Sequence, residues 1–179
     1  MFKQYYIPIF ISFATKIIII VFIPLIASHF LLNFKFVNIW EAWNVWDARH
    51  YVDIATSNYH RASNDEAVLI GFLPFLPLMI YIFKSIFQIG ALVSGYIVST
   101  VTTVLLSMIL YKLVLLDYSK KTAILTIIML FIFPTSFFLH IPFTESLFIL
   151  LSVSAFYFTR TGHYWVSFLC IGFATFTKN

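Results

Sequence analysis

The residue types best suited to chemistry are concentrated in one polar segment, residues 33–66, which lies between long apolar runs. It holds five of the seven acidic residues of the chain, together with three basic residues and two histidines. Binding and catalytic groups are often carried on loops that a rigid scaffold positions. We therefore expect the chemistry of the protein at this segment, although a solvated connector between helices would also be polar.

Asp47 is the candidate general base of this segment. Residues 40–55 include three tryptophans and have helical periodicity, as expected of a helix at a membrane interface. One face of this predicted helix carries Asp47, Trp43, His50, Tyr51 and Ile54. The only basic neighbour of Asp47 at helical spacing is His50, and a carboxylate beside aromatic surface is suited to taking a proton. The alternative interpretation is an aromatic belt that carries solvated charges.

Arg49 and Asp53 lie four residues apart on another face of the same predicted helix. This spacing favours an ion pair, so Asp53 is expected to have a structural role. An exposed pair of this kind contributes only about 0.3 kcal/mol to stability.

A second unusual stretch, residues 133–146, interrupts an otherwise membrane-deep apolar run. Pro134 and Pro142 break the helical pattern, His140 lies between them, and Glu145 follows. Broken helices at membrane depth are tolerated only where the backbone faces protein or a wet cavity. Glu145 has two interpretations: it orients a hydroxyl of a substrate, or it favours the N-terminus of the next helix, with Thr144 as the cap.

The elements that position these residues are expected to be membrane helices. Of the 179 residues, 61% are hydrophobic, 20% aromatic and 10% charged. A soluble domain carries about a quarter charged residues. There are 11 Lys and Arg against 7 Asp and Glu, but the basic residues are mostly single and lie between apolar runs, which excludes a nucleic-acid-binding face.

The predicted fold is an all-α, polytopic membrane helix bundle. Each apolar run is expected to form a helix, because lipid offers the backbone no other partner. The runs are Ile7–Leu32, Ala67–Phe87, Ile89–Leu116, Thr122–Phe138, Ser146–Thr159 and Tyr164 to the end. At about 20 residues per span, the length fits five or six spans. No repeat or linker divides the chain, so residues 1–179 form a single predicted module.

Basic residues predict which side of the membrane each loop faces. Lys3, residues 112–121 and Arg160 are assigned to the inner side, and the segment 33–66 to the outer side. The connection at residues 138–145 is then also an outer one.

The runs between residues 67 and 116 conflict with this assignment, because two crossings would return the chain to the outer side. The basic loops require an odd number of crossings there. Pro74 and Pro77 make the first of the two runs the one expected to be broken or re-entrant.

Four short motifs follow one another between residues 46 and 178. They are WDARHY (46–51), GFLPFLP (71–77), FPTS (133–136) continuing to FTES (143–146), and ATFTK (174–178). In this order they resemble four motifs of the PIG-V family of GPI mannosyltransferases and its prokaryotic relatives. The family motifs are W-D-x-x-H-F/Y, F-x-P-x-x-P, P-A/T-S-x-F continuing to Y/F-S/T-E-S/A, and A-T-x-x-R/K. Each motif is weak alone, whereas four in register are a specific signal.

The resemblance implies a GT-C type glycosyltransferase whose first outer loop carries the interfacial helix. Such an enzyme moves a sugar, here expected to be mannose-like, from a polyprenyl- or dolichyl-phosphate donor to a glycolipid or glycan acceptor, with inversion. The reaction is expected at the outer or lumenal face of a bacterial plasma membrane or an endoplasmic reticulum membrane. The lipid carrier holds the donor, so no nucleotide-sugar Rossmann motif and no cofactor is expected. Enzymes of this type differ in their need for a divalent metal, and Asp47 with Glu145 is too small a ligand set to predict one.

The first motif supplies the expected catalytic residues. By resemblance, Asp47 is the catalytic base and His50 its neighbour in the pocket, while Arg49 and Tyr51 belong to the substrate-binding set. Inversion at the anomeric carbon needs a carboxylate to take the acceptor proton and cations to stabilise the departing phosphate.

The other motifs supply residues expected to surround the substrate. The prolines of GFLPFLP shape the cavity wall, Glu145 lines the same cavity, and His140 belongs to the substrate-binding set. Lys178 stands where the family more often has arginine, so it would meet the donor phosphate as a point charge instead of a fork. Lys16, inside the first apolar run, has two interpretations: it faces the lipid phosphate, or, as slightly favoured, it snorkels to the inner interface.

Two other classes of function stay open at this stage. A small transporter or channel also has intramembrane polar residues and broken helices, but it would carry inverted repeats and polar residues at mid-membrane. The other is a non-catalytic fragment or a partner subunit, and members of the family continue beyond the last motif into further membrane segments. The chain is therefore expected to be the N-terminal part of a longer enzyme.

Overall fold

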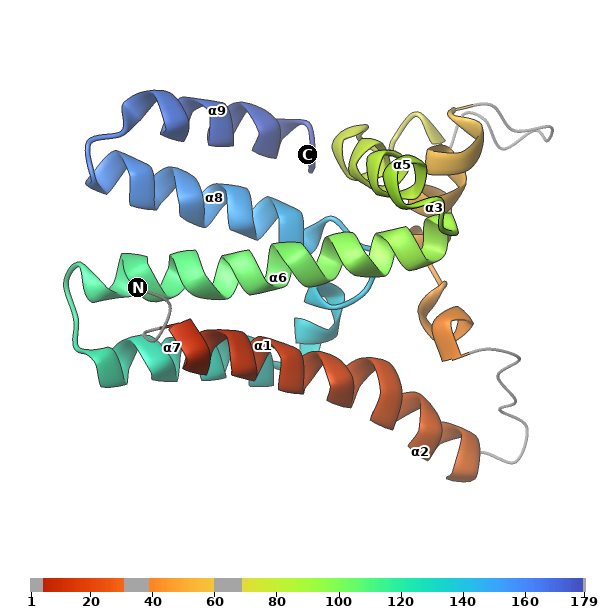
Figure 1. Cartoon of the computed structure of the whole chain (residues 1–179), viewed down its shortest axis with the longest axis horizontal. Coiled ribbons are helices and arrows are strands. Elements are labelled where there is room, and N and C mark those ends of the chain that lie inside the picture. The colour runs from red at the N-terminus through yellow and green to blue at the C-terminus, as the bar shows by residue number, and fades with distance from the viewer. Residues whose placement is uncertain (1–4, 31–38, 60–68, 179) are drawn as a thin grey trace.

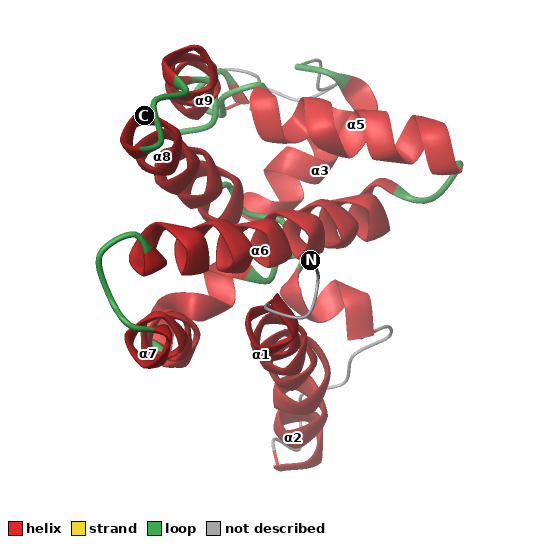
Figure 2. Cartoon of the chain, turned by 60° about the vertical axis from the view of Figure 1, so that its left-hand side comes forward, coloured by secondary structure: helices red, strands yellow, loops and turns green. Residues whose placement is uncertain are grey.

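The structure, a computed structural model, describes residues 5–30, 39–59 and 69–178. These residues form helices and no strand, which confirms the all-α fold class. The longer helices are α1 (Tyr6–Ile17), α2 (Ile23–Phe30), α3 (Asp47–Ser57), α5 (Phe75–Phe87), α6 (Ala91–Leu115), α7 (Lys120–Ile132), α8 (Glu145–Arg160) and α9 (Tyr164–Thr175). Helix α6 forms the centre, with α1 and α7 on one side, α8 and α9 on the other, and α3 and α5 near one end (Figures 1 and 2).

The N-terminal helix is continuous from Tyr6 to Phe30, but it is not α-helical throughout. A π-helical segment, η2 (Ile18–Phe22), joins α1 to α2 directly before Pro24. Proline has no N–H to donate to the preceding turn, and a π-type turn is one way in which a helix accommodates that loss. The helix curves along its length from α1 to α2 (Figure 1).

Within the described part of the chain, two helices have the length and hydropathy of a membrane span: residues 6–30 and α6, each of 25 residues. The apolar helices α5 and α9 contain 13 and 12 residues, or roughly 20 Å at 1.5 Å per residue, against about 30 Å of hydrocarbon core. The span count of five or six therefore stays a prediction. Among the described residues between 67 and 116, α6 is the only helix long enough to span the membrane. The odd number of crossings that the basic loops require stays a prediction.

One end of the bundle gathers the loops that were predicted to face inward. Arg160 forms two hydrogen bonds with the Asp117 carboxylate, at 2.7 and 3.0 Å, and lowers the pKa of Asp117. The ammonium of Lys112 lies 5.4 Å from the ring of Tyr5 and 5.9 Å from that of Tyr157. Tyr5, the α6–α7 turn and the α8–α9 turn thus lie together, while Lys3 falls outside the described residues.

The helical break predicted from Pro134 and Pro142 is present between α7 and α8. A 3-10 helix, η4 (Pro134–Leu139), follows α7, and an irregular stretch leads to α8 at Glu145. Side chains of α6 and α1 satisfy its free carbonyls: Thr103 Oγ1 donates to Leu139 O at 2.7 Å, and the ammonium of Lys16 donates to His140 O at 2.7 Å. Irregular backbone is tolerated here because it is buried against protein that supplies donors.

The helix predicted over residues 40–55 is wrong in its first half. A 3-10 turn, η3 (Ile39–Trp43), comes first, and α3 begins only at Asp47. Between them Trp46 has φ 48° and ψ −126°, inside a turn closed by the Ala48 N–H donating to Val45 O at 3.1 Å. Trp43 is therefore not on a shared helical face with Asp47. The interfacial position of α3 stays a prediction.

Candidate functional site

Helix α3 carries the WDARHY motif and packs on the GFLPFLP segment. The ring of Phe72 lies 4.9 Å from that of His50 and 5.1 Å from that of Tyr51. The Tyr59 hydroxyl donates to Phe72 O at 2.8 Å. Two motifs that are some twenty residues apart are therefore in contact, and Asp47 lies exposed at the first turn of α3.

Tyr51 connects the first motif to the start of α8. Burial raises the pKa of Tyr51 to about 12, and its hydrogen bond with the Thr144 side chain opposes this shift. The negative charges of Asp47 and Glu145 raise it further, so both carboxylates are close enough to act on the phenol. Tyr51 is therefore a neutral hydroxyl near neutral pH, and both Asp47 and Glu145 act on it electrostatically.

Glu145 and Lys178 form an ion pair across the site. The Lys178 ammonium lies 2.7 Å from Glu145 Oε1, with the two side chains 44% and 25% exposed. The other oxygen of Glu145, Oε2, is buried and has no hydrogen-bond partner among the described residues. The structure thus pairs two residues that the sequence assigned separately to the substrate site.

The last motif is held in place by α5. The Phe75 N–H donates to Phe176 O at 3.2 Å, and the rings of Phe75 and Phe173 stack at 4.9 Å. These contacts fix the end of α9 against the first turn of α5. They explain why Lys178 lies beside α8 although it is 33 residues from Glu145 in sequence.

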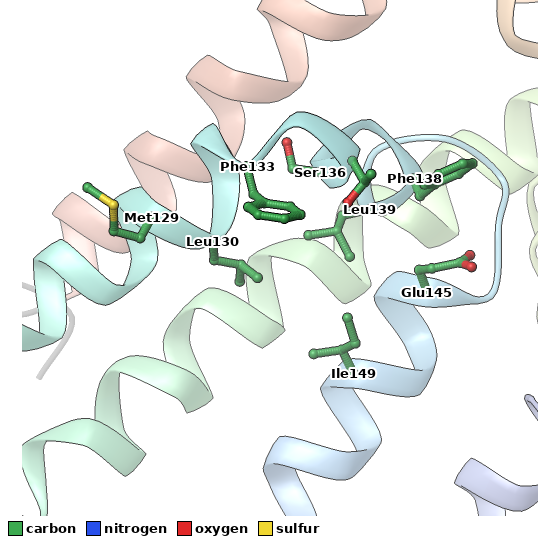
Figure 3. Close-up of a pocket in the computed structure, with 9 residues that line it drawn as sticks. Met129, Leu130, Phe133, Ser136, Phe138, Leu139, Glu145 and Ile149 are labelled. Carbon is green, nitrogen blue, oxygen red and sulfur yellow. The ribbon is translucent and has the colours of Figure 1, made fainter.

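Two apolar grooves lie beside α8, and each has one member of the ion pair in its lining. The first has a volume of about 400 Å³ and is lined by α7, η4 and the start of α8, with Phe138 and Glu145 at one end and Met129 and Leu130 at the other (Figure 3). The second, of about 420 Å³, lies between α8 and α9 and reaches Lys178. A charged group therefore accompanies apolar surface in both grooves, an arrangement suited to amphipathic ligands.

His140 and Lys16 lie inside the bundle. The side chain of His140 is fully buried and packs 5.4 Å from the ring of Phe131, and neither ring nitrogen has a hydrogen-bond partner within the described part of the chain. The substrate contact expected for His140 stays a prediction. The Lys16 ammonium donates to Ser99 Oγ at 2.9 Å as well as to His140 O, so it is held internally and does not follow the snorkelling interpretation.

Several polar atoms around α3 are buried without a hydrogen-bond partner among the described residues. They are Trp43 Nε1, Asn44 Oδ1 and His50 Nδ1, in addition to Glu145 Oε2. Buried polar groups are nearly always hydrogen-bonded, so such atoms invite a ligand or water. Arg49 lies on the exposed side of α3.

Sequence reasoning missed some residues of the site. Thr144 precedes α8, as a cap would, but its side chain makes no capping hydrogen bond and bonds with Tyr51 instead. Nothing in the sequence, apart from its place in the GFLPFLP motif, indicated that Phe72 contacts His50 and Tyr51. The described residues contain no cluster of three or more His, Cys, Asp or Glu that could hold a metal ion.

A comparison with known proteins gives one match. The model of the family described as Mannosyltransferase (PIG-V) matches residues 7–179. No curated protein and no solved structure matches the chain.

Proposed function

The chain belongs to the PIG-V mannosyltransferase family, and from this premise we propose that it transfers a mannose-like sugar from a polyprenyl-phosphate donor to a hydroxyl of a glycolipid or glycan. Membership of the family supports a membrane-associated glycosyltransferase. The observation that carries the proposal is the ion pair of Glu145 and Lys178, which lies near Asp47 and Tyr51 and contributes to two apolar grooves. A lipid-linked sugar needs both features, a cation for its phosphate and apolar surface for its chain.

Asp47 is the proposed general base. Its exposed carboxylate takes the proton of the acceptor hydroxyl while the hydroxyl oxygen forms a bond to the anomeric carbon. The bond from that carbon to the phosphate oxygen breaks, and polyprenyl phosphate leaves with the electron pair. Attack from the opposite face inverts the configuration of the sugar.

Lys178 is the proposed contact for the departing phosphate. Its ammonium is a mobile point charge, and in the free enzyme it is neutralised by Glu145 at 2.7 Å. A phosphate that attracts Lys178 frees the Glu145 carboxylate to accept hydrogen bonds from sugar hydroxyls. Tyr51, held neutral, is a further donor at the same place.

The groove between α8 and α9 is the proposed path of the donor chain. It extends from Phe148 to Thr159 along α8, which is about 17 Å at 1.5 Å per residue. Lys178 lies at the Phe148 end of the groove. A donor phosphate bound there can place its hydrocarbon chain along the whole groove. In this arrangement the site lies at the outer end of the bundle, opposite the basic loops.

The test is a transfer assay with purified protein in liposomes. Polyprenyl phosphate [³H]mannose is supplied with an alkyl mannoside acceptor, and the labelled product is separated from the donor. We expect labelled disaccharide of inverted configuration. Absence of both transfer and donor binding would refute the proposal, and movement of a solute without sugar transfer would favour a transporter.

A further inference from the structure

Trp46, the residue before Asp47, has an unusual backbone for its size. Its φ of 48° and ψ of −126° correspond to the first central position of a type II′ turn, which glycine dominates because a side chain there is crowded. Trp46 is nevertheless one of the bulkiest residues, and 59% of its surface is exposed. Strained conformations persist where the surrounding structure enforces them, and they are frequent at ligand sites.

The indole of Trp46 is held on one side and open on the other. Its ring centroid lies 6.3 Å from that of Phe137 and 6.4 Å from that of Phe138. Phe137 in turn stacks on Trp43 at 5.7 Å. Since Phe138 also lines the groove that contains Glu145, this aromatic cluster connects Trp46 to the proposed catalytic site.

A cavity of about 310 Å³ adjoins this cluster. Trp43 and Trp46 line it together with small and apolar residues of α2 and the turn: Ile23, Pro24, Ala27, Ala42 and Val45. Trp43 Nε1 and the neighbouring Asn44 Oδ1 are buried without a partner among the described residues. The region therefore offers aromatic faces, one unused donor and one unused acceptor.

We propose that Trp46 and Trp43 form the binding platform for a pyranose ring of the acceptor. The axial C–H bonds on one face of a pyranose carry a slight positive charge and pack on the negative face of an indole. The reacting hydroxyl at its edge then faces Asp47, the residue that follows Trp46 in the chain. This inference rests on the proposed function, because it names the acceptor side of the same site.

An aromatic belt at a membrane interface would not need this geometry. Trp165, at the start of α9 and at the opposite end of the bundle, is 83% exposed and is the matched example. It lies within a regular helix, whereas Trp46 occupies a strained turn next to the candidate base. An anchoring role would be served equally well by a tryptophan in a relaxed conformation.

The test compares four variants in lipid nanodiscs, with octyl α-mannoside as the probe. Its binding is measured by titration, and Tm by thermal unfolding. For Trp46→Ala we expect binding about 3- to 10-fold weaker, the range for loss of one aromatic contact. Trp46→Phe should fall between the native protein and Trp46→Ala, and Trp165→Ala should bind as the native protein does.

Trp46→Gly separates the platform from the fold. Both variants lose the indole, but only glycine relieves the turn, so Trp46→Gly should unfold at a higher Tm than Trp46→Ala and bind the mannoside equally weakly. Native-like binding by Trp46→Ala, or equal weakening in Trp165→Ala, would overturn the inference. If the binding differences hold but no sugar is transferred, the platform stands and the proposed function fails.

Discussion

Replacing Lys178 by glutamine should separate the stability of the site from its activity. Among the described residues, Lys178 has one charged partner, Glu145, at 2.7 Å. Two unit charges about 4 Å apart attract by about 4 kcal/mol at an effective dielectric constant of 20. Because Lys178 is 44% exposed and Glu145 25% exposed, screening and desolvation reduce the net contribution to about 1 kcal/mol or less.

The expected loss in catalysis is larger. A hydrogen bond to a charged group contributes about 1.5–3 kcal/mol, which corresponds to about a 10- to 150-fold decrease in kcat/KM for the donor. Lys178→Gln should therefore be folded, with a small decrease in Tm, and should transfer sugar poorly. Lys178→Arg keeps the positive charge and should retain most of the activity.

The matched control is Arg160→Gln, which removes an ion pair of the same length at the other end of the bundle. It should leave the donor kcat/KM unchanged. The assay is steady-state transfer at varied donor concentration, together with thermal unfolding of each variant. Native donor kinetics in Lys178→Gln, or an equal defect in Arg160→Gln, would refute the role of Lys178 as the phosphate contact.

Three further substitutions test how the site is held. Gly95→Ala places a Cβ 2.9 Å from Pro142 Cβ, so it should cost about 1–3 kcal/mol of unfolding free energy and lower Tm and activity together; an unchanged Tm would contradict the close packing. Thr144→Val removes the hydrogen bond to Tyr51 and should cost about 1 kcal/mol by thermal unfolding, whereas a more stable variant would show that the bond does not matter. Burial raises the pKa of Tyr51 from 10.0 to about 12, so the stability that its neutral form contributes is complete below pH 10 and is lost between pH 10 and 12. Tyr51→Phe should therefore show a smaller decrease in Tm over this pH range. An identical decrease in the variant would show that another group causes it.

The breaks in the helices could be predicted from local residue types. Pro134 and Pro142 indicated the interruption before α8, and Pro74 and Pro77 indicated the shortened run that became α5. Proline acts through its own missing N–H and fixed φ, so the signal needs no knowledge of the fold. The positive φ of Trp46 could not be predicted in this way, because tryptophan has no local preference for that conformation. The turn depends on the packing around it.

The internal polar contacts depend on tertiary structure and were only partly predictable. Ser99 and Thr103 look like ordinary members of an apolar helix, yet they donate hydrogen bonds to the carbonyls of the broken segment. Lys16 joins the same network from α1, 124 residues away from His140 in sequence. The resemblance assigned Glu145 to the cavity and Lys178 to the donor phosphate, but their direct ion pair depends on the contact between α5 and the end of α9.

The central claim is that Asp47 is the base of a sugar transfer, and Asp47→Asn tests it most directly. The amide keeps the size of the side chain but does not take a proton. We expect kcat to fall by about 100- to 10,000-fold, as is usual for loss of a general base, while donor binding is kept. Asp53→Asn, on the same helix, is the control and should have a much smaller effect. Unchanged turnover in Asp47→Asn would contradict the account.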